Sequence, residues 1–252
     1  QNGSFGWFYF KSLSDDQLNP GFDNWTYTTI PNNSSYWSDG FTGVRRANYA
    51  IQNLATSSLP ASTKNRFIGI ARLNRAWSYY QLVREYGDVQ WLSDVIQDPN
   101  DTTAIYGERT DRDVVMDSVL TDLDYAIANI GSSSDKTAWS SNMKSDICLY
   151  EGTYCKYRTL ADNGKAPDAS RAQRFLQESV KASEELINSG KYSLTTNYGE
   201  IYNSLDLTSN REIIFFRNYN LTIINNYIIN FIINKFIVND NFIIFVHFFL
   251  QS

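Results

Sequence analysis

The feature that most constrains the fold is a long run of helical periodicity between Thr63 and Tyr86. Small, apolar and aromatic residues recur there at helical spacing and line one stripe: Gly69, Ile70, Leu73, Ala76, Trp77, Tyr80 and Val83. Such a stripe predicts an amphipathic helix that buries one face. Gly87 follows at the position where a left-handed cap commonly ends a helix.

The large side chains of this segment indicate a structural role. Trp77 and Tyr80 lie on the stripe, which favours packing in the core over an exposed ligand platform. Three arginines lie partly off the stripe: Arg72, Arg75 and Arg84. We expect their guanidinium groups to reach solvent or to pair with acidic neighbours such as Glu85 and Asp88.

Further segments read as helices in the same way: 41–55, 110–130, 142–159 and 170–189. In the segment 110–130, the Thr110 hydroxyl is expected to cap the helix, with Asp113 as the acidic third position of a capping box. Helices in succession with short connections predict a mainly α fold, in which antiparallel helix pairs stack as an α-solenoid. A clean repeat of about 34 residues is not visible.

The two ends of the chain differ from this helical region, which we assign to residues 41–220. Residues 1–40 set many aromatic side chains among Asn, Ser, Gly and Pro without a lasting period, which predicts an irregular, loop-rich segment. Residues 221–252 are mostly Ile, Asn and Phe, and polar residues interrupt every apolar run, so a membrane span is not indicated. Codons of A and T alone yield these three residue types. We therefore interpret 221–252 as a frameshift or read-through product.

Residue types exclude most familiar enzyme classes. The single histidine, His247, lies in the tail, so residues 1–220 offer no imidazole for general-base catalysis or for zinc. The patterns G-x-S-x-G, G-x-x-x-x-G-K-[ST] and G-x-G-x-x-G are absent. A glycosidase needs only two facing carboxylates, but the adjacent pairs Asp15-Asp16 and Glu184-Glu185 are typical of solvated surface. We predict a protein that is not an enzyme and uses no cofactor.

Metal ions and nucleic acids are not indicated as ligands. Asp98, Asn100 and Asp101 offer oxygen atoms that suit calcium, but without the full loop spacing a plain turn is favoured. The net charge is −5 and no long basic run occurs, so the electrostatic footprint of a nucleic-acid binder is missing. Cys148 and Cys155 are two helical turns apart, with Cα atoms about 10 Å from each other, so buried thiols are expected and not a disulfide.

Six short motifs follow one another along residues 41–219. They are RRANYAIQNL (45–54), RLNRAWSYYQLVREYGDVQWL (72–92), DLDYAIANI (122–130), LYEGTYCKY (149–157), SGKYSL (189–194) and EIIFFRNY (212–219). Their order and approximate spacing resemble the SusD/RagB family of outer-membrane lipoproteins of Bacteroidota. The resemblance implies a scaffold of tetratricopeptide-like helix pairs, with the ligand site on irregular segments.

The resemblance also implies a function and partners. Members of this family sit on the cell surface through a lipidated N-terminal cysteine. They capture oligosaccharides without cleaving them and act as a lid over a TonB-dependent SusC-like transporter. The resemblance therefore implies an oligosaccharide ligand, a SusC-like partner and an outer-membrane location for this protein.

The sequence departs from the family pattern at several points. Gln90 stands where the GDVP motif usually has proline, and Asp146 stands where the family usually carries arginine. The chain begins at Gln1 without a signal segment, a lipobox or an acceptor cysteine. The family continues well beyond EIIFFRNY. We therefore expect a chain that is incomplete at both ends.

A ligand site is expected in the segment FDNWTYTTIPNNSSYWSDGF (22–41), before the first scaffold helix. Sugars present apolar C–H faces between hydroxyl groups, so a glycan site needs aromatic faces flanked by amide and carboxylate groups. The stacking candidates are Trp25, Tyr27, Tyr36 and Trp37, and the polar candidates are Asn24, Asn33 and Asp39. The alternative for each ring is that it plugs the scaffold.

Three other functions remain open from the sequence. The same architecture can capture peptides, since the family includes peptide-associated members of the RagB type. A generic helical-repeat adaptor without a small-molecule ligand is a second alternative, and a glycoside hydrolase is a third. The aromatic and Asn-rich segment 22–41 favours glycans.

Overall fold

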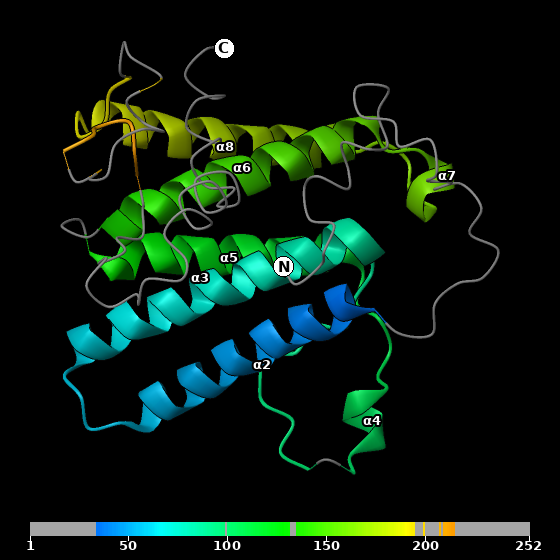
Figure 1. Ribbon diagram of the computed structural model, residues 1–252. Coiled ribbons are helices and arrows are strands. Elements are labelled where there is room, and N and C mark those ends of the chain that lie inside the picture. Colours follow the sequence, from blue (N-terminus) through cyan, green and yellow to red (C-terminus); the bar gives the residue numbers. More distant parts are fainter. Residues whose placement is uncertain are drawn as a thin grey trace, which may run out of the picture.

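The chain folds into a stack of long helices joined by short connections (Figure 1). The computed structural model describes residues 34–98, 100–131, 135–194, 199, 207 and 209–214. The long helices are α2 (Ser35–Thr56), α3 (Ala61–Tyr86), α5 (Arg112–Ile130), α6 (Asp135–Tyr157) and α8 (Ala169–Asn188). Two short helices, α4 (Thr102–Ile105) and α7 (Leu160–Asn163), lie in the connections.

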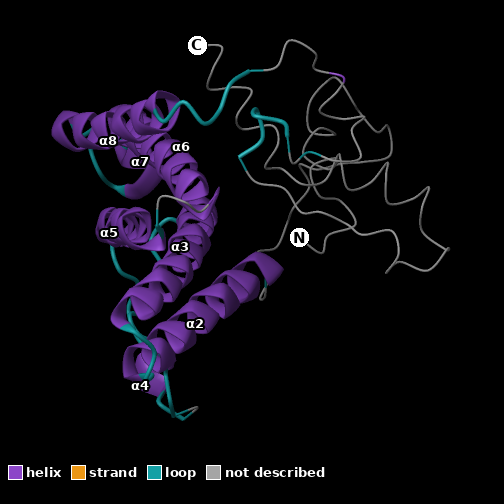
Figure 2. Cartoon of the chain, turned by 90° about the vertical axis from the view of Figure 1, so that its left-hand side faces the viewer, coloured by secondary structure: helices purple, strands orange, loops and turns teal. Residues whose placement is uncertain are grey.

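The long helices pack on their neighbours in the chain, and α5 contacts α3 more extensively than it contacts α6. The contacting pairs are α2 with α3, α3 with α5, α5 with α6, and α6 with α8, and successive helices run in opposite directions. Figure 2 shows the stack turned by 90°, with α2 and α4 at one edge and α8 at the other. This arrangement confirms the predicted mainly α fold of tetratricopeptide-like helix pairs.

The core lies where the stripes of these helices meet. Its buried residues include Leu73, Ala76, Tyr79, Tyr80, Val83, Val115, Val119, Leu123, Ala126, Ile130, Ile147 and Phe175. The stripes predicted for segments 63–86 and 110–130 supply most of this set, and burial of their apolar surface is the main stabilising term. The core role predicted for Tyr80 and Trp77 is confirmed, because Tyr80 is buried and Trp77 packs partly buried against the cluster.

Three helix starts differ from the sequence prediction, one of them that of α6, which begins at Asp135 and not at residue 142. The segment 35–40, predicted to be irregular, forms the beginning of α2, because Trp37 and Phe41 lie one turn apart and both pack on the core. The N-cap of α5 is Asp111, whose carboxylate accepts a hydrogen bond from the Asp113 amide. The predicted cap, Thr110, instead accepts a hydrogen bond from the Trp91 amide.

Arg84 is exposed, as one of the two predicted alternatives requires, but Arg72 and Arg75 do not pair with acidic neighbours in sequence. Arg75 is buried and forms an ion pair with Asp122 of α5, and Arg72 lies 3.6 Å from the same carboxylate. Asp88, one of the expected partners, accepts a hydrogen bond from the backbone amide of Arg112. The true partner of Arg75 lies 47 positions away, so local sequence spacing could not identify it.

The connection after α3 is fixed by buried polar groups. The Asn48 amide group of α2 donates hydrogen bonds to the Leu92 and Asp94 carbonyls, at 2.8 and 3.2 Å. Arg75 donates to the Asn48 side-chain oxygen and to the Ser93 carbonyl. The segment that follows the GDVQ motif is therefore tied to both α2 and α3.

Several predictions concern the ends and the single residues of the chain. Residues 1–33 and 215–252, which include most of the aromatic segment and the whole Ile/Asn/Phe-rich tail, lie outside the described residues. Among the described helices, none has the length and apolar character needed to cross a membrane. Cys148 and Cys155 are free and buried, as predicted.

Candidate functional site

The predicted ligand residues fall into two groups. Trp25, Tyr27, Asn24 and Asn33 lie outside the described residues. The other three predicted residues, Tyr36, Trp37 and Asp39, lie at the start of α2. This is the end of the stack where α3 finishes and α5 begins (Figure 1).

Trp37 points inward and is enclosed by other side chains. Its ring lies 4.8 Å from the ring of Phe41, one turn further along α2. Tyr86, the last residue of α3, meets the Trp37 ring edge-on at 5.0 Å and 87°. The Arg109 guanidinium lies over the Trp37 ring, 5.5 Å from its centroid. Trp37 is thus partly buried, which agrees with the alternative that this ring plugs the scaffold.

Tyr86 and Arg109 are held in place by their own surroundings. The Tyr86 hydroxyl lies 2.6 Å from the Ser34 hydroxyl, to which it donates a hydrogen bond. Arg109 precedes Thr110, whose backbone pairs with Val89 in an isolated antiparallel bridge. Ser34 lies within the predicted segment 22–41 but was not among its named ligand residues, and sequence reasoning did not place Tyr86 or Arg109 at the site. Tyr86 lies in the REYGD motif, but no local pattern links Arg109 to Trp37.

Tyr36 and Asp39 lie on the outward side of the same helix. Tyr36 is 46% exposed, and Asp39 is exposed three positions later, so the two side chains share one face. An exposed phenol ring beside a carboxylate offers a stacking surface and a hydrogen-bond acceptor. Of the described residues that were predicted to bind ligand, these two are accessible for direct contact.

A second group of aromatic rings runs between α3 and α6. Tyr80 meets Tyr150 edge-on at 5.4 Å, and Tyr150 lies nearly parallel to Tyr154 at 6.3 Å and 17°. The Arg84 guanidinium lies over the rings of both Tyr80 and Tyr150, at 5.3 and 5.8 Å. Trp77 extends the row on α3, 5.7 Å from Tyr80. These rings are largely engaged with one another and with Arg84.

Asp146 lies one turn before Tyr150 on α6. Burial raises the pKa of its carboxyl to about 6, although the charge of Arg84 acts in the opposite direction. Burial also raises the pKa of the Tyr80 hydroxyl, and the Asp146 carboxylate adds to that effect. The pKa of Asp146 therefore lies closer to neutral pH than the ordinary pKa of an aspartate.

A network of ion pairs joins α5, α6 and α8 near α7. Glu151 accepts from Arg112 at 2.6 Å and from Arg171 at 3.3 Å. Asp113 accepts from Arg158 at 2.8 and 3.0 Å. Asp113, Glu151 and Cys155 lie close enough together to hold a metal ion. Their groups are engaged otherwise: the carboxylates bind guanidinium groups, and the Cys155 thiol, whose pKa burial raises to about 12, donates to Glu151. This network reads as structural.

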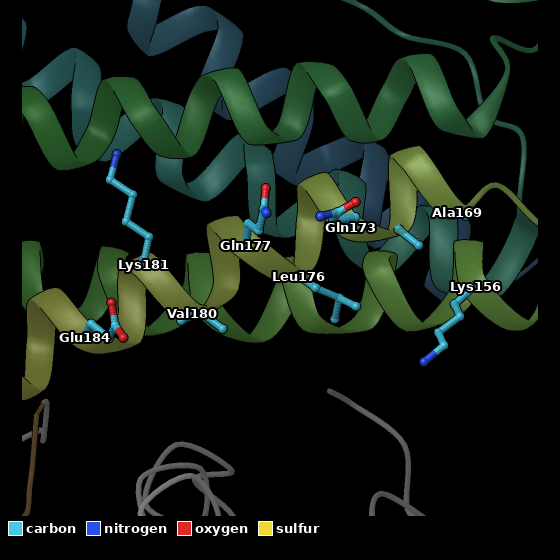
Figure 3. A pocket seen from close by; sticks show the side chains of 9 residues that line it. Lys156, Ala169, Gln173, Leu176, Gln177, Val180, Lys181 and Glu184 are labelled. Carbon is cyan, nitrogen blue, oxygen red and sulfur yellow. The ribbon is translucent and has the colours of Figure 1, made fainter.

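A shallow trough of about 550 Å³ follows the outer face of α8. Figure 3 shows Lys156, Leu176, Val180 and Glu184 along one side and Gln173, Gln177 and Lys181 along the other. Ala169 and Ala172 complete the lining. The lining offers aliphatic surface, amide groups and charges of both signs, but it contains no aromatic ring for a sugar to stack on.

Comparison with known proteins gives consistent matches. The SusD-like family model described as "Starch-binding associating with outer membrane" matches residues 7–145. A SusD-like protein of Bacteroides ovatus is 25% identical over 190 residues, which cover 73% of this chain and 32% of the relative.

Solved structures give the same picture. A SusD superfamily protein of Parabacteroides distasonis superposes with a TM-score of 0.57 at 25% identity, covering 74% of this chain and 38% of that one. A crystal structure with xylogluco-oligosaccharide superposes with a TM-score of 0.55 at 23% identity, covering 71% and 34%. The chain spans less than two fifths of the length of each of these relatives.

Proposed function

Because the chain belongs to the SusD-like family, we propose that it binds oligosaccharides at a bacterial cell surface and does not cleave them. The family description names starch binding and association with the outer membrane, and a structural neighbour was solved with a xylogluco-oligosaccharide. The proposal includes delivery of the captured glycan to a TonB-dependent SusC-like transporter. It also includes a lipid that holds the protein on the outer membrane.

The observation that carries the proposal is the start of α2. Tyr36 and Asp39 are exposed side by side there, directly after the segment that contains the other predicted ligand residues. We place the saccharide on this surface, with Trp25, Tyr27 and Tyr36 as stacking rings. Asn24, Asn33 and Asp39 are the proposed hydrogen-bonding groups, and Trp37 contributes chiefly by fixing the helix turn.

Binding without cleavage fits the chemistry of the described residues. A glycosidase needs an acid and a second carboxylate that face each other across a cleft. The carboxylates of Asp113, Asp122 and Glu151 are engaged by arginines. Asp146, whose pKa of about 6 would suit an acid, lies among aromatic rings beside Arg84. We assign no catalytic residue.

The experiment is calorimetry of the purified protein against α-glucan, β-glucan and xyloglucan oligosaccharides and against a peptide panel. Heat with at least one saccharide, weakened in Trp25→Ala and in Tyr36→Ala, is expected. If Trp25→Ala, Tyr36→Ala and Trp37→Ala all bind like the unsubstituted protein, the site assignment is wrong. Release of reducing ends from a polysaccharide, abolished by one carboxylate substitution, would revive the hydrolase alternative.

Peptide capture is the second candidate, and the α8 trough favours it. Its aliphatic lining from Leu176 and Val180, with the amides of Gln173 and Gln177 alongside, suits a peptide better than a sugar ring. Heat with peptides only, lost in Val180→Asp, would reject saccharide capture in favour of this function. Co-purification with an outer-membrane transporter distinguishes both from a generic adaptor.

A further inference from the structure

The start of α2 is held by contacts to other parts of the fold and not by the usual local cap. Ser34 occupies the N-cap position, but its side chain makes no capping hydrogen bond to α2, and the first turn contains no acidic residue. A serine at this position normally accepts a hydrogen bond from an amide of the first turn. Here the Ser34 hydroxyl instead accepts from Tyr86 of α3.

Trp37 provides the second attachment of the same turn. Tyr86 meets its ring edge-on, and the Arg109 guanidinium lies over it. Tyr86 therefore contacts both Ser34 and Trp37, which come before and after Tyr36 in the sequence. Edge-on aromatic pairs and cation–π contacts are each individually weak, so removal of one group is expected to loosen the turn without unfolding the helix.

We infer that Tyr86 and Arg109 are positioning residues for the ligand surface. They hold the first turn of α2 against the end of α3, so that Tyr36 and Asp39 on that turn keep one orientation relative to α3. Neither residue needs to touch the ligand, because a surface that is already ordered loses less conformational freedom on binding. This inference rests on the proposed function, since it names what supports the proposed saccharide surface.

Tyr86→Phe is the sharpest test, because it removes one hydroxyl and keeps the ring against Trp37. Loss of one hydrogen bond that orders a binding turn is expected to weaken saccharide affinity about three- to tenfold. Amide hydrogen exchange in residues 35–40 of the ligand-free protein should become faster at the same time. Arg109→Ala is expected to act in the same direction, and Arg109→Lys less strongly because it keeps the charge over the ring.

Tyr79→Phe is the matched control. It removes a hydroxyl that accepts a hydrogen bond from the Leu92 amide, in the same helix but away from Ser34. This control is expected to lower the melting temperature while leaving exchange in residues 35–40 and saccharide affinity unchanged. If Tyr86 only stabilised the fold, Tyr86→Phe would also lower the melting temperature and leave exchange in residues 35–40 and saccharide affinity unchanged.

Ser34→Ala completes the design, because it removes the other partner of the same hydrogen bond. The double variant with Tyr86→Phe should bind no more weakly than either single variant. If the unsubstituted protein binds saccharide and Tyr86→Phe binds equally well, the inference is wrong and the proposed function stands. If the unsubstituted protein binds no saccharide of the panel, the proposed function fails and the inference fails with it.

Discussion

Arg75 and Asp122 form a two-point ion pair between α3 and α5, with Nε to Oδ2 at 2.7 Å and Nη2 to Oδ1 at 2.8 Å. Both residues are buried, and the same guanidinium also binds Asn48 and the Ser93 carbonyl. One charged group thus ties together α2, α3, α5 and the connection after α3. The pair is consequently a point where a single substitution affects several elements at once.

Asp122→Ala is expected to lower the free energy of unfolding by about 3–5 kcal/mol, because it leaves the buried charge of Arg75 without its partner. Urea denaturation measures the change. Arg174→Ala is the matched control, because it breaks a pair with Asp117 in which the two side chains are 50% and 42% exposed. The control should cost about 0–1 kcal/mol. Similar losses in the two variants would contradict the structural role of the Arg75–Asp122 pair.

Asp146 is expected to make the protein less stable at neutral pH than at mildly acidic pH. Its folded-state pKa of about 6 lies above the ordinary value of 3.8, so the folded protein binds this proton more tightly than the unfolded chain. Ionisation of Asp146 therefore lowers the free energy of unfolding. This loss is absent below pH 4 and complete above pH 6. Asp146→Asn should therefore raise the free energy of unfolding at pH 7, by up to about 3 kcal/mol. At pH 4 the free energies of unfolding of Asp146→Asn and of the unsubstituted protein should be equal.

Asp113→Asn is the matched control for this experiment, because its carboxyl shifts in the opposite direction. Burial acts to raise the pKa of Asp113, but hydrogen bonds from Arg158 and Lys165 outweigh it and hold the pKa below the ordinary value. Asp113 therefore contributes stability above pH 4 that is lost on acidification. Asp113→Asn should be less stable than the unsubstituted protein at pH 7, and the gap should narrow below pH 4. If Asp146→Asn and Asp113→Asn changed the stability at pH 7 in the same direction, these pKa shifts would be contradicted.

Gly152 lies where α6 packs tightly on α8. A Cβ atom there would lie 2.7 Å from Leu176 Cγ and 3.0 Å from the Ala172 carbonyl oxygen. Alanine usually stabilises a helix interior relative to glycine, by about 0.5–1 kcal/mol. Gly152→Ala should nevertheless lower the free energy of unfolding by about 1–3 kcal/mol, because the backbone of α8 must shift. Gly43→Ala is the control, since its Cβ meets only the side chain of Ser78, which can rotate. Equal melting temperatures would argue against tight packing at Gly152.

Tyr36→Ala is expected to weaken saccharide binding about three- to tenfold through loss of one stacking ring. Asp39→Ala should weaken it as well, through loss of a hydrogen-bond acceptor. Tyr49→Ala is the control on the same helix, because Tyr49 is also exposed but lies more than three turns away. Calorimetry with the tightest ligand of the panel gives the affinities. A larger loss of saccharide affinity in Tyr49→Ala than in Tyr36→Ala would indicate that the site lies nearer to Tyr49 on α2.

Periodicity predicted the helices better than it predicted their first residues. The stripe in 63–86 and the one in 110–130 became α3 and α5, because an apolar face alone determines that such segments form packed helices. The start of α2 was missed because its residues are mostly polar and weak helix formers. Only Trp37 and Phe41 pack inward there, and that packing depends on Tyr86, which lies far along the chain.

The same reason limits what the sequence revealed about the site. Aromatic residues before the first helix suggested a ligand surface, which stays a prediction, and Tyr36 and Asp39 are the exposed residues of that set within the described part of the chain. Tyr86 and Arg109 became visible only once α3 and the connection before α5 were placed in space. The Arg75–Asp122 pair was missed for an equivalent reason, since a buried charge takes its partner from whichever helix packs over it.

The order of helices in the stack has a consequence for how the chain folds. Since each long helix rests mainly on its sequence neighbour, most native contacts close short loops, and such topologies fold quickly. In such stacks of helices, folding can also begin at several places and spread to neighbouring helices. Among the described helices, α5 packs between α3 and α6, whereas α2 and α8 each pack mainly on one long helix. Partial opening should therefore begin at α2 or α8 and reach α3, α5 and α6, which each pack between two long helices, later.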